Sequence, residues 1–223
     1  MKMFRHTILP ILTGLLFVYS AVWMLQMFSY ISLFSICAYL ILAAALFRRR
    51  RDYLLTVGTV VLILARWLLF SHFCTFEFAD EIQMFVPLWI MLTGIYLVST
   101  VLMLIIILIN LVPKFKKFRP YVNPLWFLPG LVMLAGVILY GAMLASSMGQ
   151  SIIQGIVTGA RSLNNINTPL SDMIGTFLVP LWMKLCAIED LKPYEDMVGQ
   201  MLTPEQLEEK RRELGLAKRK TAR

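Results

Sequence analysis

Few side chains in this sequence could perform acid–base or metal chemistry. The 223 residues include two histidines, His6 near the N-terminus and His72 at the edge of an apolar segment, and the long apolar segments contain no aspartate or glutamate. Hydrolases and metalloenzymes need several such side chains to converge at a single site. The HExxH, GxSxG and GxxxxGK[ST] motifs are also absent from the sequence. We therefore expect a protein that is not an enzyme and that binds no cofactor or metal ion.

Arg66 is the one charge that lies clearly inside an apolar segment. A charge within hydrocarbon costs at least about 2.5 kcal/mol on insertion scales, so it needs a partner or a route to water. Three interpretations remain open. Arg66 extends to the outer interface, forms a buried ion pair with Asp80 or Glu81, or lines a polar pathway.

The elements that position these residues are apolar segments about twenty residues long. Hydrophobic residues make up 59% of the chain and charged residues 15%, which is far from an ordinary soluble domain. A helix of about twenty residues spans roughly 30 Å, the thickness of the hydrocarbon core. We predict an all-α polytopic membrane protein with a transmembrane domain at 1–188 and a tail at 189–223. The six expected spans are 7–26, 30–47, 53–71, 84–112, 124–147 and 173–188, the last being short and interrupted by Pro180.

The positions of the basic residues predict the orientation of these spans. The net charge is +8, and nineteen of the 21 lysines and arginines lie before the first span, at 48–51, at 114–119 or from Lys184 onward. Six spans place all four groups on one side, which the positive-inside rule assigns to the cytoplasm. Both termini are therefore expected to be cytoplasmic. Because the basic residues flank apolar segments, we expect no nucleic-acid partner.

Glycines in two segments predict close helix packing, because small residues let helices approach one another. Gly130, Gly136 and Gly141 lie in the fifth span. Gly155 and Gly159 form a GxxxG step in a short amphipathic segment, 150–162, on the outer side. That segment is a surface helix, a re-entrant element or a contact between subunits.

The tail shows two helical patterns that suit docking. An apolar stripe follows Pro193 at helical spacing, and Thr203, Pro204 and Gln206 form the sequence of a capping box with a proline in the first turn. The expected docking residues are Tyr194, Met197, Val198, Met201 and Leu207. The basic end, Lys218 to Arg223, is expected to attract anionic lipid head groups.

These features favour a non-enzymatic integral membrane subunit of a multi-protein assembly, such as a secretion, channel or sensor complex. A small-solute transporter or pore is the alternative, and an intramembrane enzyme is the third hypothesis. The expected partners are the lipid bilayer and other membrane subunits, copies of this chain included. A compact chain without an organellar transit peptide favours the bacterial inner membrane.

Overall fold

The computed structural model describes residues 7–25, 30–48, 53–75, 86–145, 170–196, 203–214 and 216. The regular structure in these ranges is helical, so the all-α prediction is confirmed. The main helices are α1 (Leu9–Leu25), α2 (Tyr30–Phe47), α3 (Tyr53–Thr75), α4 (Val86–Leu111), α6 (Leu128–Ala145), α8 (Leu170–Asp196) and α9 (Pro204–Glu213). Between α4 and α6 lie the 3-10 helix η2 (Pro113–Phe118), the single turn α5 (Arg119–Val122) and the 3-10 helix η3 (Asn123–Leu125).

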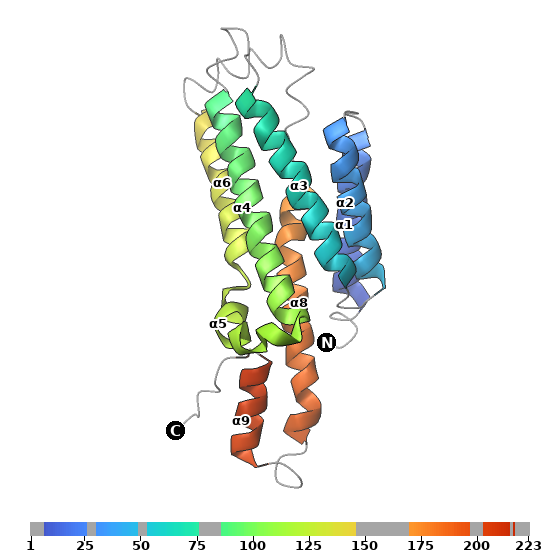
Figure 1. Cartoon of the computed structure of the whole chain (residues 1–223), viewed down its shortest axis with the longest axis vertical. Helices are drawn as coiled ribbons and strands as arrows, with labels where there is room; N and C mark the ends of the chain where they lie inside the picture. The colour runs from blue at the N-terminus through green and yellow to red at the C-terminus, as the bar shows by residue number, and fades with distance from the viewer. Residues whose placement is uncertain are drawn as a thin grey trace.

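The helices form one bundle that is closed by α8. Consecutive helices contact one another from α1 to α4, and α4 contacts α6, while α8 contacts α1, α4 and α6. Figure 1 shows α8 passing between the α4–α6 pair and the α1–α2 pair and continuing beyond the bundle beside α9. The largest buried side chains come from several helices and meet in one core. They include Phe17, Tyr39, Leu42, Leu62, Met103 and Trp182.

The distribution of side chains is that of a protein surrounded by lipid. Large apolar side chains are exposed along the outer faces of α1, α2, α3, α4 and α6, whereas Thr13, Ser20, Thr59, Ser99 and Thr100 are buried. A large exposed apolar surface marks a membrane or partner interface. Four helical stretches are long and apolar enough to cross a membrane, at 30–47, 53–71, 90–111 and 119–139, and α1 and 174–188 are shorter apolar helices. The chain is a membrane protein with candidate transmembrane helices.

Two boundaries differ from the sequence prediction. The fifth span was expected to begin at Pro124, but that residue lies in η3 and the long helix begins at Leu128. Pro120 and Pro124 lack the N–H that a helix interior requires, which favours short helical turns over one straight helix. The second difference is that α8 continues through Pro180 and past position 188, where the tail was expected to start. α8 packs against α1, α4 and α6, and neighbouring helices help to satisfy the backbone groups that a proline frees in a membrane helix.

Candidate functional site

A row of buried polar side chains follows the inner face of α4. Thr93, Ser99 and Thr100 are all buried. The Ser99 hydroxyl donates a hydrogen bond to the Pro129 carbonyl of α6 at 2.8 Å, and the Thr100 hydroxyl donates to the Tyr96 carbonyl of its own helix at 2.7 Å. These bonds satisfy hydroxyl groups that would otherwise be costly in an apolar environment.

Arg66 reaches this polar row from α3. Its side chain is only 5% exposed. Its Nη1 donates to the Tyr96 carbonyl at 2.8 Å and also to the Thr100 hydroxyl. The guanidinium carbon lies 5.7 Å from the centre of the Tyr96 ring, within the range of a cation–π contact. Helix α4 thus supplies a carbonyl, a hydroxyl and a ring face to this buried side chain.

A second polar cluster lies where α4 ends. Asn110 and Asn123 exchange amide hydrogen bonds, with Asn110 Nδ2 at 2.8 Å from Asn123 Oδ1 and Asn123 Nδ2 at 3.2 Å from Asn110 Oδ1. Asn110 Nδ2 also donates to the Ile106 carbonyl at 2.8 Å. Asn123 is 4% exposed. We call Asn110, Arg119 and Asn123 the polar node.

Arg119 closes the C-terminus of α4. Its Nε donates to the Ile109 carbonyl at 3.2 Å and its Nη2 to the Asn110 carbonyl at 2.7 Å. The last carbonyls of a helix have no partner within the helix and carry a partial negative charge. A guanidinium is therefore well placed there, and Arg119 turns the chain back toward α4.

The polar node also holds the C-terminal helix α9. Asn123 Nδ2 donates to the Leu214 carbonyl at 3.0 Å, which joins residues 91 positions apart. Lys210 Nζ lies 4.9 Å from the centre of the Tyr194 ring on α8 and 2.8 Å from Glu213 Oε2. The hydrogen bond with Glu213 raises the pKa of Lys210 above its ordinary value. At the start of α9, both bonds of the predicted capping box are present.

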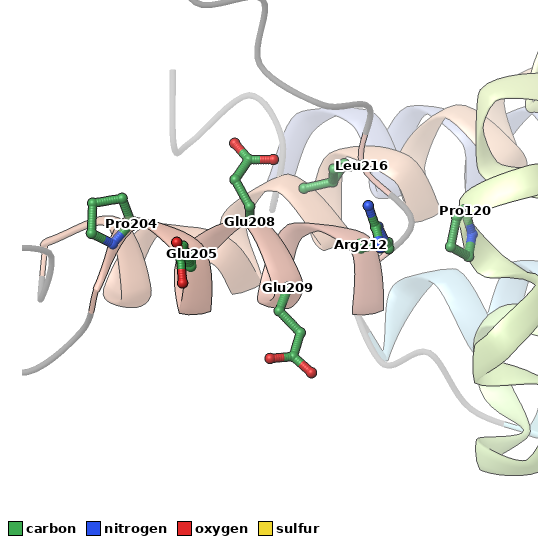
Figure 2. A pocket seen from close by; sticks show the side chains of 7 residues that line it. All are labelled: Pro120, Pro204, Glu205, Glu208, Glu209, Arg212 and Leu216. Carbon is green, nitrogen blue, oxygen red and sulfur yellow. The ribbon is translucent and has the colours of Figure 1, made fainter.

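A pocket of about 650 Å³ separates α9 from α5 (Figure 2). It is lined by Pro120, Pro204, Glu205, Glu208, Glu209, Arg212 and Leu216. Glu208 and Glu209 project from opposite sides of α9, and Arg212 lies toward Pro120 (Figure 2). Glu205, Glu208 and Glu209 form no ion pair within the described ranges, so their carboxylates remain open to a partner.

Several glycines lie at close helix contacts, and the sequence pointed to some of these positions. A Cβ at Gly136, a predicted packing residue, would lie 3.0 Å from Ile95 of α4. Gly141 lies within α6. Gly130, also expected to pack closely, lies against Phe177. Two close contacts were not predicted: Gly175 packs against Phe17, and Gly58 packs against Leu42. Nothing in the local spacing marks these two glycines, because their partners come from other helices.

Many predicted site residues lie outside the described ranges. These are Asp80, Glu81, Gly155, Gly159, Met197, Val198 and Met201, together with the segment 150–162. Tyr194 and Leu207 are described and are both half-buried. Sequence reasoning missed Thr100 and the polar node; the one available indication was an asparagine, Asn110, at the end of an otherwise apolar run.

Comparison with known proteins does not assign this chain to a family. No family model, curated protein or solved structure matches this chain. Among the described residues, no group of three or more histidine, cysteine, aspartate or glutamate side chains is placed to hold a metal ion.

Proposed function

We propose that this chain is a non-enzymatic subunit of a multi-protein membrane assembly and that α9 is its docking element. The observation that carries the proposal is the attachment of α9. Its C-terminal carbonyl is held by Asn123, and its Lys210 contacts Tyr194 of α8. A helix of ten residues is marginal in water by itself, so these contacts keep it ordered beside the bundle. The carboxylates of Glu205, Glu208 and Glu209, which form no ion pair within the described ranges, then remain available to a partner.

The proposed arrangement has six spans, with both termini on the cytoplasmic side of a bacterial inner membrane. Four stretches that could cross are joined by the apolar helices α1 and 174–188, which would complete six. In Figure 1, α1 begins, α2 ends and α3 begins at the end of the bundle where α5 lies. The basic groups beside these positions would then share one side, as the positive-inside rule requires.

The partner of α9 is proposed to be a protein segment that carries basic residues. Glu205 lies three residues from Glu208 and four residues from Glu209, while Glu208 and Glu209 project from opposite sides of α9 (Figure 2). Charge complementarity of this kind mainly determines specificity and the rate of association. The partner is another subunit or a second copy of this chain.

Removal of α9 tests the docking role. A chain that ends at Leu202 keeps α8 intact, whereas a cut after Cys186 would divide that helix. We expect this chain to insert and fold but to lose the proteins that co-purify with the full chain in mild detergent. Replacing Glu205, Glu208 and Glu209 with glutamine should have the same effect while preserving α9.

A chain that ends at Leu216 is the matched control, because it keeps α9 and removes only the basic end. It should retain the partner. If the chain that ends at Leu202 keeps every co-purifying protein, α9 is not the docking element.

A small-solute transporter or pore is the second candidate. Arg66 and the buried hydroxyls of α4 favour it, because polar side chains between membrane helices often mark a substrate pathway. Uptake or conductance by the purified protein alone in liposomes would support this candidate over the assembly subunit.

A further inference from the structure

The connection between α4 and α6 is a helical elbow, which we define as residues 113–125. It consists of η2, α5 and η3. The stretches 90–111 and 119–139, which adjoin and overlap it, are apolar enough to cross a membrane. The elbow therefore lies where the chain turns between two candidate spans.

The sequence of η2 gives the elbow an aromatic face and a basic face, while Pro113 and Lys116 occupy the third face. A 3-10 helix has three residues per turn, so residues i and i+3 share a face. Phe115 and Phe118 occupy one face, and Lys114 and Lys117 occupy the next. Tyr121 follows Phe118 after three more residues. The three aromatic side chains are 42%, 54% and 75% exposed, in chain order.

The inner side of the elbow is held by the polar node. Arg119 bonds the last carbonyls of α4, and Asn123 bonds both Asn110 and Leu214. These bonds hold the elbow against the bundle. A surface that is ordered before binding loses less conformational entropy when a ligand arrives.

Lys114 and Lys117 differ in how readily they could bind an anionic ligand. Both are exposed, and within the ranges that the structure describes neither forms an ion pair or a hydrogen bond. Lys117 lines a groove of about 360 Å³ that Glu209 and Glu213 also line. Glu213 is bonded to Lys210, but Glu209 has no such partner and would repel an anion at Lys117. Lys114 does not line this groove, so it should contribute more.

We propose that the elbow is a binding surface for anionic phospholipid. The Phe115, Phe118 and Tyr121 rings lie at the boundary between acyl chains and head groups, where aromatic side chains are enriched. Lys114 and Lys117 contact the phosphate, and a net negative charge on the lipid distinguishes it from a zwitterionic lipid. This proposal uses the position of the elbow between two spans and does not depend on docking by α9.

Native mass spectrometry of the full chain in mild detergent tests the proposal. The probe is an equal mixture of phosphatidylglycerol and phosphatidylcholine. Lys114→Gln should lower retained phosphatidylglycerol about fivefold, as expected for the loss of one cation near an anionic surface, and should leave phosphatidylcholine unchanged. Arg48→Gln is the matched control, because it removes one exposed charge at the end of α2. It should leave both lipids unchanged.

Two further measurements make the proposal falsifiable. Phe118→Ser combined with Tyr121→Ser should reduce retention of both lipids, because it removes the aromatic face. Excess inorganic phosphate should not displace phosphatidylglycerol. Displacement by phosphate would show a simple anion site, and equal effects of Lys114→Gln and Arg48→Gln would show nonspecific charge attraction. Either result would overturn the proposal.

Discussion

Arg66 is stabilised by a neighbouring helix through acceptors that carry no formal charge. The Tyr96 carbonyl and the Thr100 hydroxyl both accept from its Nη1. Hydrogen bonds that involve a charged donor are stronger than neutral ones. The side chain is 5% exposed and is hydrogen-bonded to α4. The predicted ion pair with Asp80 or Glu81 stays a prediction, because both residues lie outside the described ranges.

Thr100→Val should destabilise the protein through Arg66. The substitution keeps the shape of the side chain but removes an acceptor from a buried charge, which costs about 1–3 kcal/mol. Arg66→Leu should cost less, since it removes the charge itself. In the Arg66→Leu background, Thr100→Val should then have little effect. Thermal unfolding of the original protein, the two single variants and the double variant in detergent measures this coupling.

Thr59→Val is the control for that experiment. Thr59 is also fully buried, but its hydroxyl donates only to the Leu55 carbonyl of its own helix, at 2.7 Å. Thr59→Val should lower the stability of the protein less than Thr100→Val does. Equal losses of stability from the two substitutions would show that Arg66 does not depend on Thr100.

At the scale of elements, the contacts between helices depend on glycines that face large side chains. A Cβ at Gly58 would lie 2.8 Å from Leu42 Cγ and 3.1 Å from the Leu42 backbone nitrogen. A side chain can rotate away from a new atom, but the backbone of α2 cannot. Gly58 therefore determines how closely α2 and α3 approach.

Gly58→Ala should lower the unfolding temperature in detergent. Overpacking of this kind costs about 1–3 kcal/mol, because α2 and α3 must separate. Gly94→Ala is the matched control, since its nearest neighbour is Phe70 Cε2 at 3.8 Å, an ordinary contact. This control should be neutral or slightly stabilising. Similar melting curves for the two variants would contradict a close contact at Gly58.

The polar node links α4, the elbow and α9, so its two asparagines should differ in their effect on the tail. Asn123→Ala removes the bond to the Leu214 carbonyl as well as the Asn110 pair. Asn110→Ala removes the pair and the bond to the Ile106 carbonyl, but it leaves the bond to α9. The first substitution should therefore release α9, and the second should largely retain it.

Trypsin cleavage after Lys210, Arg211 and Arg212 measures this difference. When α9 detaches and reattaches faster than trypsin cleaves it, the cleavage rate is proportional to the population in which α9 is detached. A loss of about 1.4 kcal/mol in the attachment free energy corresponds to a tenfold increase in that population. We expect Asn123→Ala to increase the cleavage rate up to about tenfold. If Asn110→Ala accelerates cleavage equally, the bond to Leu214 does not hold the tail.

At the scale of the whole molecule, the three cysteines allow the proposed topology to be measured. Cys74 is exposed in the last turn of α3, on the side proposed to be external. In a chain with Cys37→Ser and Cys186→Ser, an impermeant maleimide should label Cys74 in intact cells. In a cysteine-free chain, Glu205→Cys should be labelled only after the membrane is permeabilised. Labelling of this cysteine in intact cells would place α9 outside and contradict six spans.

The sequence by itself determined the helical class, the apolar segments and the start of α9. These features are local: a helix satisfies its own backbone hydrogen bonds, and the Thr203 capping box involves residues three positions apart. Only the tertiary structure decided which side chains meet. Arg66 and Thr100 are separated by 34 positions and Asn123 and Leu214 by 91, so no local pattern links them. The packing of α8 against α1, α4 and α6 likewise brings together helices that lie far apart in the sequence. These contacts form only when the helices pack together.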